Sequence, residues 1–385
     1  MPQLLEEEVT ELLGRRKSVR QDPVDAVPGS RNGHGKPRRL TLSNGTVTVR
    51  RPRVRGLEQR FDSVVLPLFK RRTDEVGRLL PELYLHGLSK GDFELALRGL
   101  LGEGAPLSAS SIDRLKAKWQ REYAEWKQLD MTKLEVVYQW ADGIYVKAGL
   151  EKDKAALLVI IGALTNGRKV FLACESGYRE SKESWSGVLR NLTDRGLKLG
   201  RLTIADGHLG IWSALGEIHP EGKEQRCWNH KIRNVLDCFP KRIRSEAGEY
   251  LKRIPYAETL SECERLRDVF GDRYQKDYPK AMEKLLSDWD RMITFYSFPK
   301  EHWVHIRTTN VVESPFSSVR LRTDAAKRFK KIQNATAMIW KLLQVAEKNF
   351  RTLKGYWLLP DVYTGKKFVD GVMKHETKVL ERMAA

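Results

Sequence analysis

The chain has 385 residues, 41% hydrophobic and 31% charged, a composition that predicts a globular protein of two or three domains. Its longest apolar run, residues 155–164, is too short to span a bilayer, which argues against a transmembrane helix. Four cysteines do not make a disulfide framework, and the acidic start of the chain does not resemble a signal peptide. We therefore expect a cytoplasmic protein.

The net charge of +19 is the strongest bulk signal and predicts a polyanionic partner. Nucleic acid is the default partner, although association with ribosomes or with a membrane surface also fits. The charge is clustered, because residues 31–60 hold nine Lys or Arg against Glu58, and residues 320–354 hold ten against Asp324 and Glu347. Such clusters suit contacts with phosphate groups.

The N-terminal segment is expected to form a helix, a basic arm and a small hairpin. Apolar residues recur at helical spacing in residues 1–20, residues 21–39 are rich in Pro, Gly and Asn, and Asn44-Gly45 predicts a hairpin in residues 40–54. The arm either lies along DNA or is a solvated surface ribbon. On the first interpretation, the candidate DNA contacts are Arg38, Arg39, Arg51 and Arg53.

Residues 64–130 are predicted to be helical. Ser110 and Asp113 have the spacing of a capping box, which predicts a helix from Ile112 to about Trp126. With the helix before it, opened by Ser89, and a turn rich in Gly, this fits a helix-turn-helix DNA-binding unit. Its candidate DNA contacts are Arg114 and Lys118. The alternative is a helical hairpin that merely has a basic face.

Residues 133–147 have the alternation of a strand. One face is expected to carry Asp142 together with Leu134, Val136, Tyr138, Trp140, Ile144 and Val146. A carboxylate on an apolar strand face is costly unless a cation meets it. The possible explanations are a salt bridge, a hairpin turn at Asp142-Gly143 or a metal ligand.

Further strands and helices follow. Residues 155–164 predict a strand buried on both faces, with other strands at 169–174 and 199–206. An amphipathic helix is expected between its N-cap Ser181 and Gly196, and another at 208–217. This order predicts an α/β fold with a mixed sheet flanked by helices and a long antiparallel leading edge.

The rest of the chain is predicted to be mainly helical. No strand pattern interrupts residues 231–297, which we interpret as a helical insertion, and residues 332–352 predict a long helix near the C-terminus. Four tryptophans are interpreted as core residues: Trp140, Trp185, Trp212 and Trp228.

Three acids form the candidate site: Asp142 in a strand, Asp206 at the end of another strand, and Glu313 near a helix start. Each has a structural alternative when taken singly; Asp206, for example, could cap the following helix. Carboxylates that lie together repel one another unless cations neutralise them, and Mg²⁺ or Mn²⁺ prefers oxygen ligands. Two such ions on a basic protein suit phosphodiester cleavage and strand transfer.

The chain resembles the Mutator-type transposases of bacterial insertion sequences, a branch of the DDE enzymes with an RNase H-like core. The resemblance covers roughly residues 40–350. It rests on the segments DGIYVK (142–147), LTIADGH (202–208), RCWNH (226–230), EHW (301–303), RTTNVVES (307–314) and VRLRT (319–323). Their order also matches: the second Asp, 64 positions after the first, precedes a Cys-x-x-His, a helical insertion and the Glu.

The resemblance implies that Asp142, Asp206 and Glu313 form a metal-binding catalytic triad with two Mg²⁺ or Mn²⁺ ions. Cys227 and His230 would be the family's Cys-x-x-His signature, and the N-terminal third would recognise terminal inverted repeats. The expected protein is a DNA transposase that cuts at its element's ends and joins them to target DNA. It would act as at least a dimer on double-stranded DNA, in the bacterial cytoplasm and associated with the nucleoid.

Two other functions stay open. One is a catalytically inactive or domesticated DNA-binding protein, which would need no intact triad. The other is an RNase H-like nuclease, which would need neither the helix-turn-helix region nor end-specific binding. The intact set of three acids argues against the first.

Pro315 departs from the uninterrupted helix expected around Glu313, because an interior proline breaks a helix. Either Asn310 caps a helix whose first turn tolerates Pro315, or Ser314 caps a helix with Pro315 at its first position. In both cases Glu313 would lie at the positive end of a helix dipole.

The surroundings of the triad contain further candidates. Cys227 and His230 permit a zinc site completed by His302 and His305, but half a zinc motif is weak evidence, so zinc is not expected and packing beneath the site is favoured. Three arginines near Glu313 are interpreted as phosphate contacts, with surface solvation as the alternative: Arg307, Arg320 and Arg322.

The expected domain organisation has six parts. They are the helix, arm and hairpin (1–63), a helical DNA-binding region (64–130), the first part of the catalytic core (131–230), the helical insertion (231–300), the second part of the core with the Glu helix (301–350) and a C-terminal tail (351–385).

Overall fold

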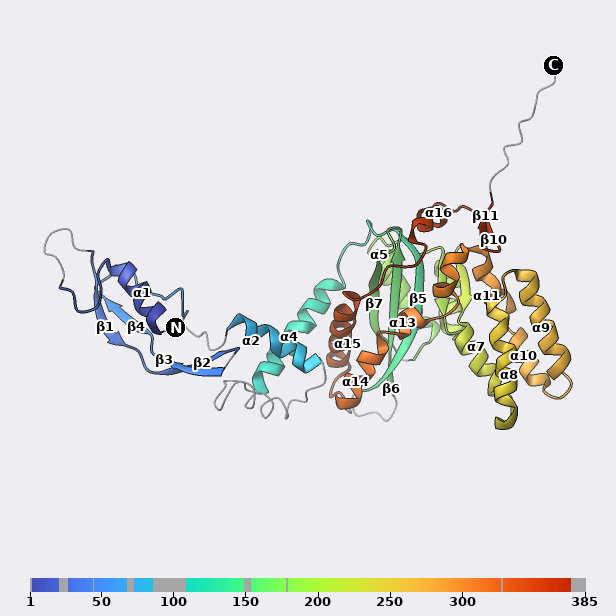
Figure 1. Ribbon diagram of the computed structural model, residues 1–385, viewed down its shortest axis with the longest axis horizontal. Coiled ribbons are helices and arrows are strands. Elements are labelled where there is room, and N and C mark those ends of the chain that lie inside the picture. The colour runs from blue at the N-terminus through green and yellow to red at the C-terminus, as the bar shows by residue number, and fades with distance from the viewer. Residues whose placement is uncertain are drawn as a thin grey trace, which may run out of the picture. The chain divides into compact units, whose positions relative to one another are not determined.

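The computed structural model describes most of the chain (Figure 1). The described residues are 2–20, 27–43, 45–67, 73–85, 109–148, 154–177, 179–326 and 328–374. They divide into two compact units, Met1–Ala117 and Lys118–Ala385. Within these ranges, no helix combines the length and apolar character needed to cross a membrane.

The first unit begins with helix α1 (Pro2–Leu13), as the leucine spacing predicts, and buries Leu5, Val9 and Leu13. The expected hairpin is also present, because β2 (Arg38–Leu42) pairs antiparallel with β3 (Gly45–Val49). Leu40 and Val49 of this hairpin pack with Leu5. The helix and the hairpin therefore share one small core.

Residues 30–34, which the sequence places in a flexible arm, instead form β1 (Ser30–His34), paired antiparallel with β4 (Pro52–Arg55). Arg31 holds this strand to α1, since its guanidinium donates to Thr10 Oγ1 at 2.8 Å and to the Arg15 carbonyl at 3.0 Å. Composition alone misses these contacts because they join residues about 20 positions apart. Residues 21–26 lie outside the described part.

Two helices follow, α2 (Asp74–Leu85) and α4 (Ala109–Trp126). Helix α4 begins three residues before the predicted Ile112, so Ser110 lies inside it. The helix predicted from Ser89 and the turn after it fall outside the described residues. The end of α4 belongs to the second unit, where Trp126 stacks on Phe171 with ring centroids 5.4 Å apart.

A five-stranded mixed sheet forms the centre of the second unit, with strand order β7-β6-β5-β8-β9. The first two pairings, β5–β6 and β6–β7, are antiparallel, whereas β5–β8 and β8–β9 are parallel. This confirms the predicted mixed α/β layer. The strands are β5 (Val136–Lys147), β6 (Lys154–Leu164), β7 (Lys169–Gly177), β8 (Leu202–Ala205) and β9 (Lys223–Arg226).

Strand β5 runs unbroken through Asp142 and Gly143, so a hairpin turn at that dipeptide is wrong. A β-bulge between Val136 and Tyr138 also places these two side chains on opposite faces of β5, whereas the sequence predicts that they share one face. Val136 packs into the cluster that contains Ile160, whereas Tyr138 hydrogen-bonds to His302 on another element. The bulge reverses the alternation, which a strict period of two does not foresee.

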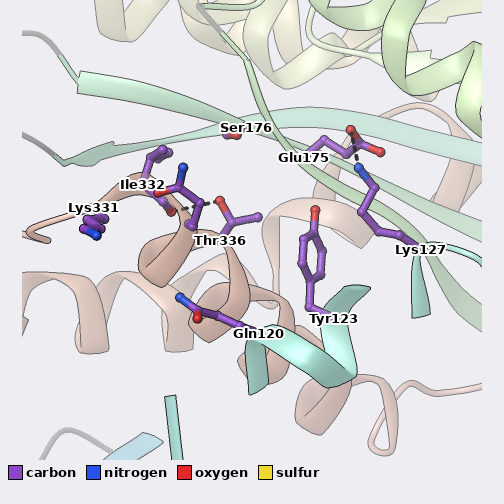
Figure 2. A pocket seen from close by; sticks show the side chains of 9 residues that line it. Gln120, Tyr123, Lys127, Glu175, Ser176, Lys331, Ile332 and Thr336 are labelled. Carbon is purple, nitrogen blue, oxygen red and sulfur yellow. Dashed lines mark hydrogen bonds and ion pairs between the residues drawn. The ribbon is translucent and has the colours of Figure 1, made fainter. Parts of the chain in front are cut away.

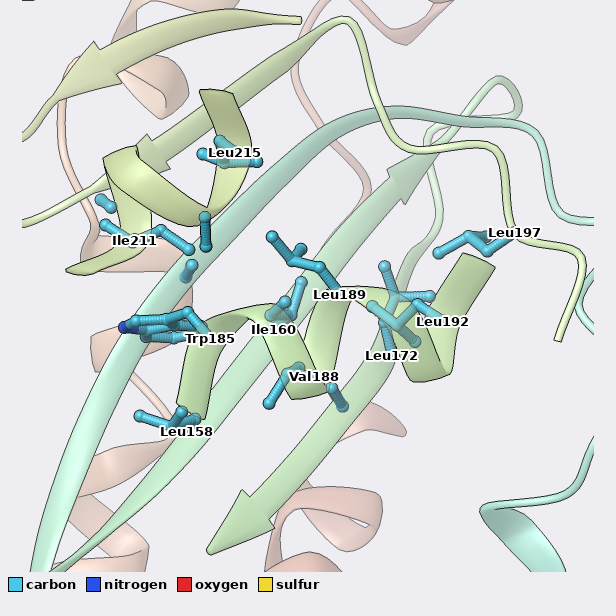
Figure 3. Packing of buried hydrophobic residues seen from close by; sticks show 14 of the residues in the cluster. Leu158, Ile160, Leu172, Trp185, Val188, Leu189, Leu192, Leu197, Ile211 and Leu215 are labelled. Atoms are coloured by element: carbon cyan, nitrogen blue, oxygen red, sulfur yellow. The ribbon is translucent and has the colours of Figure 1, made fainter. Parts of the chain in front are cut away.

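One face of the sheet is covered by α5 (Lys182–Asp194) and α6 (Leu209–Ile218), as Figure 3 shows. The hydroxyl of Ser181 caps α5 by accepting the Ser184 N–H at 3.2 Å, as predicted. All four tryptophans interpreted as core are at most 4% exposed. The side chains that α5 and α6 direct into this cluster are Trp185, Val188, Leu189, Leu192, Ile211 and Leu215.

The chain is helical after β9, as the sequence predicts for residues 231–297. The aromatic core of this segment contains Phe239, Phe270 and Tyr274. The elements of the segment are α7 (Trp228–Leu236), α8 (Lys241–Arg253), the 3-10 turn η1 (Ile254–Tyr256), α9 (Leu260–Tyr274), α10 (Pro279–Leu286), α11 (Trp289–Ile293) and η2 (Thr294–Ser297).

The chain then returns to the sheet, where α15 packs on β7 and α13 on β5. Pro315 lies between α13 and α14, and Thr309 is the N-cap of α13. Neither predicted arrangement is therefore correct, because a helix break accommodates the proline. The elements are η3 (Lys300–His302), α12 (Trp303–Ile306), α13 (Asn310–Glu313), α14 (Phe316–Ala326), α15 (Ile332–Glu347), η4 (Tyr356–Leu358), α16 (Leu359–Tyr363), β10 (Phe368–Val369) and β11 (Val372–Met373).

Candidate active site

The parallel pairing of β5 and β8 brings Asp142 and Asp206 together. Ala141 is the register partner of Ala205, and each aspartate is the next residue of its chain segment. Strand β8 ends at Ala205, so Asp206 lies at its carboxyl end. Two acids that are 64 positions apart in sequence thus become neighbours through the sheet.

Asp142 is 9% exposed, and its Oδ1 accepts the Gly143 N–H at 2.8 Å. Burial raises the pKa of its carboxyl to about 8, and the negative charges of Asp206, Glu180 and Glu313 act in the same direction. In the described part of the chain, neither Lys nor Arg forms an ion pair with Asp142. A salt bridge therefore does not explain this buried acid.

Asp206 is half-buried, and its Oδ1 accepts the His208 N–H at 2.9 Å. Helix α6 begins one residue later, with His208 as its N-cap. Asp206 thus orders the turn before the helix without being the cap itself. Its side chain lies beside Asp142, at the carboxyl end of the interior strand β8.

A further acid, Glu180, joins the two aspartates and was not among the sequence candidates. Its carboxylate lies with those of Asp142 and Asp206, and one oxygen of each acid falls within 4.8 Å of the others. Glu180 is 4% exposed, and burial together with the charge of Asp206 raises its pKa. In the sequence it resembles an ordinary acid before a helix cap, so no local signal identifies it.

Glu313 ends the short helix α13 and lies in a second cluster. Its carboxylate and ligand atoms of Cys227 and His230 all fall within 4.8 Å of one another, and His230 Nδ1 is 3.8 Å from Glu313 Oε1. The hydroxyl of Thr309 donates to the same Oε1. The structure therefore brings Glu313 to the Cys-x-x-His segment, and its charge still contributes to the raised pKa of Asp142.

The two other histidines of the zinc alternative lie elsewhere. His302 bridges the Tyr138 hydroxyl, at 2.7 Å, and the Gly355 carbonyl, at 2.9 Å. His305 Nε2 accepts the Lys354 N–H at 3.1 Å. Both rings are thus engaged in packing and do not complete a four-ligand set with Cys227.

The three arginines near Glu313 differ in their surroundings. Arg307 donates to the Trp303 and Pro255 carbonyls and lies over the Tyr256 ring, 4.3 Å from its centroid. Arg322 is only 3% exposed, whereas Arg320 is exposed.

The candidate DNA contacts of the first unit also differ. Arg39 and Arg53 are exposed, Arg38 donates to the Leu66 and Pro67 carbonyls, and Arg51 pairs with Asp62 at 2.5 Å. In α4, Arg114 and Lys118 are exposed, and Lys118 lies 3.5 Å from Glu122.

A separate pocket lies between the end of α4, β7 and the start of α15 (Figure 2). Lys127 and Glu175 form an ion pair of 3.1 Å on one side, and Tyr123 and Thr336 also line it. The Tyr123 hydroxyl donates to the Cys174 carbonyl at 2.7 Å. None of the clustered acids lines this pocket.

The sheet and its acids define a mixed α/β protein with a candidate site for a divalent cation. Comparison with known proteins gives the family: a model described as "Transposase, Mutator family" matches residues 1–352. The chain belongs to this family of transposases. The resemblance found in the sequence is therefore confirmed.

Named relatives agree with this assignment. The transposase for insertion sequence element IS6120 of Mycolicibacterium smegmatis is 42% identical over 307 residues, which cover 80% of this chain and 93% of the relative. The transposase for element IST2 of Acidithiobacillus ferrooxidans is 40% identical over 279 residues, which cover 72% of this chain and 94% of the relative. The transposase for element ISRM5 of Rhizobium meliloti is 26% identical over 370 residues, which cover 95% of this chain and 90% of the relative.

Proposed function

We propose that this chain binds the terminal inverted repeats of its insertion sequence and catalyses metal-dependent DNA strand cleavage and strand transfer. Membership of the transposase family supports action on DNA. The net charge of +19 supports a polyanionic substrate. Asp142, Asp206 and Glu313 are the proposed catalytic residues.

The observation that carries this proposal is the neighbouring position of Asp142 and Asp206 on paired parallel strands. A fold gains no stability from burying carboxylates side by side, because their charges repel and burial disfavours ionisation. Functional sites are where such arrangements are found. Glu313 is close enough for its charge to act on Asp142.

The donor set fits Mg²⁺ or Mn²⁺, since carboxylate oxygens are the ligands these ions prefer and no Lys or Arg within the described ranges pairs with the two aspartates. Asp142, Asp206 and Glu313 would hold the ions. When bound, such ions supply charge stabilisation to a phosphodiester displacement. The protein groups fix the acids: the Gly143 and His208 N–H groups orient the aspartates, and Thr309 orients Glu313.

Several finer parts of the function are also proposals. The mixed strand order supports an RNase H-like core. Exposed arginines in β2 and β4 support DNA contacts by the N-terminal region, with Arg39 and Arg53 as the leading candidates. Two DNA ends must be joined, so at least a dimer is expected on DNA.

The test is cleavage of DNA that carries the element's own ends, measured with Mg²⁺ for the wild type and for Asp142→Asn, Asp206→Asn and Glu313→Gln. Each change keeps the side-chain shape and replaces the carboxyl group with an amide, which cannot ionise. We expect loss of nicking with end binding largely kept. Asp194→Asn, an exposed aspartate at the end of α5, is the matched control and is expected to nick normally.

Full nicking by any of the three variants would remove that residue from the triad. End binding by the wild type without any nicking would favour an inactive DNA-binding protein. Cleavage with no preference for the element's ends would favour an RNase H-like nuclease.

A further inference from the structure

Glu180 reaches the two aspartates from the loop between β7 and α5. It comes directly before Ser181, the N-cap of α5, and the hydrogen bond to Ser184 fixes this end of the helix. Trp185, one turn into α5, is 1% exposed in the main core. The backbone that carries Glu180 is therefore anchored by a helix that packs on the sheet.

Two glycines leave room for Glu180. A Cβ on Gly143 would lie 2.4 Å from Glu180 Oε1 and 2.6 Å from its Cδ. A Cβ on Gly210 would lie 2.1 Å from the Glu180 carbonyl oxygen. Any side chain at residue 143 would displace the carboxylate, and any at residue 210 would displace the backbone. The space beside Asp142 is thus shaped around this one acid.

The charge around the three acids is unbalanced. One oxygen of each carboxylate lies within 4.8 Å of the others, and two of the side chains are at most 9% exposed. Across the described ranges, Lys and Arg form no ion pair with Asp142, Glu180 or Asp206. The Tyr145 hydroxyl and the His208 ring lower the pKa of Glu180, but burial and the charge of Asp206 outweigh them and raise it.

We propose that Glu180 is a further metal ligand, which holds a divalent cation of the Mg²⁺ or Mn²⁺ class together with Asp142 and Asp206. This inference rests on the proposed function and adds an acid that the triad does not contain. A third carboxylate fits the preference of these ions for several oxygen ligands. It also leaves Glu313, held by Thr309 in the second cluster, as a separate contributor to the site.

The test is Mn²⁺ binding by the full chain without DNA, measured from the electron paramagnetic resonance signal of free Mn²⁺. The variants are Glu180→Gln, Asp142→Asn and the control Glu183→Gln, an exposed acid three residues after Glu180. We expect Glu180→Gln to weaken binding at least tenfold, since even partners outside the ligand shell cost about 10- to 100-fold. Asp142→Asn should weaken it similarly, and Glu183→Gln should not.

Gly143→Ala supplies an independent variant, because it keeps all three carboxyl groups and displaces that of Glu180. It should weaken Mn²⁺ binding as Glu180→Gln does. Thermal unfolding without metal checks folding, and Glu180→Gln should unfold no earlier than the wild type because it removes a buried ionisable group.

The outcomes separate the two proposals. Wild-type affinity in Glu180→Gln with weakened affinity in Asp142→Asn would overturn the role of Glu180 and leave the proposed site intact. Equal weakening in Glu183→Gln would also overturn the role of Glu180, since the loss of affinity would then reflect the net charge of the protein and not a ligand at the site. Unchanged affinity in Asp142→Asn, or no binding by the wild type, would count against the proposed site itself.

Discussion

The hydroxyl of Thr309 lies 3.2 Å from the sulfur of Cys227, and the Thr309 N–H donates to the same sulfur at 3.3 Å. The hydroxyl also donates to Glu313 Oε1. A hydroxyl has one proton, so it donates to the carboxylate and accepts from the thiol. Cys227 is fully buried, and burial raises its pKa, which keeps it a thiol. The Cys-x-x-His segment thus orients Glu313 through Thr309.

We therefore expect Thr309→Val to slow DNA cleavage about 10- to 100-fold, because a hydrogen bond to a charged group contributes about 1.5–3 kcal/mol. Binding to the element's ends should be unchanged. Single-turnover cleavage at saturating protein separates the two effects. Thr309→Ser keeps the hydroxyl and should restore most of the rate.

Cys227→Ser tests the other end of this contact. Serine keeps a donor, so cleavage should fall less than in Cys227→Ala, which leaves the Thr309 hydroxyl without its donor. Equal rates for the wild type, Thr309→Val and Cys227→Ala would contradict an orienting role for this contact.

His305 is expected to make the folded chain sensitive to acid. Burial and nearby Lys169 lower the pKa of His305 to about 4, and its Nε2 accepts the Lys354 N–H, which requires the neutral ring. The unfolded chain takes up this proton near pH 6.5 and the folded chain only near pH 4. The contribution of neutral His305 to the free energy of unfolding is therefore fully present above pH 6.5 and is lost as the pH drops toward 4.

The measurement is urea unfolding of the wild type and His305→Gln between pH 8 and pH 4. Glutamine keeps an acceptor oxygen but takes up no proton. We expect the wild type to lose about 1–3 kcal/mol more than the variant over this range. Parallel pH profiles for the two proteins would show that His305 does not carry this effect.

The insertion is expected to depend on Asp288. Its carboxylate lies 2.6 Å from Arg226 Nη1, and the Arg226 side chain is only 9% exposed. Asp288 has φ 60°, a left-handed conformation that asparagine also tolerates. Asp288→Asn should therefore cost about 1–3 kcal/mol of unfolding free energy through the lost charge alone.

Glu249→Gln is the matched control for that change. Glu249 pairs with Lys252 at 3.3 Å, but its side chain is 74% exposed. An exposed pair contributes little, so this variant should stay within about 0.5 kcal/mol of the wild type. Both are measured by urea unfolding at pH 7, and equal effects would show that the buried pair adds nothing.

The sequence predicts those parts of the fold that have a local pattern. The apolar run of β6, the stripe of α5 and its Ser181 cap are all found as expected. Strand β9 is missed because Lys-Glu-Gln-Arg has no apolar alternation. Its buried Gln225 is held by the Met292 carbonyl and the Phe295 N–H, at 3.0 and 2.8 Å. Those partners lie about 70 positions away, beyond the reach of any local pattern.

The sequence predicts only those residues of the candidate site that stand out in a local pattern. Asp142 is conspicuous because it interrupts an apolar strand, and Asp206 because it ends one. Glu180 precedes a helix cap, where acids are common, so only the folded arrangement singles it out. The contact between Thr309 and Glu313 lies directly before a helix break at Pro315, for which the sequence allows two other solutions.

We propose that Asp142, Asp206 and Glu313 meet around divalent ions at a DNA end. The most direct measurement is a crystal structure of the chain with its element's end and Mn²⁺, with anomalous diffraction recorded at the manganese absorption edge. The expected result is manganese density in contact with both aspartates and with Glu313. Manganese density that is absent from this site, or that contacts the two aspartates without Glu313, would contradict this proposal.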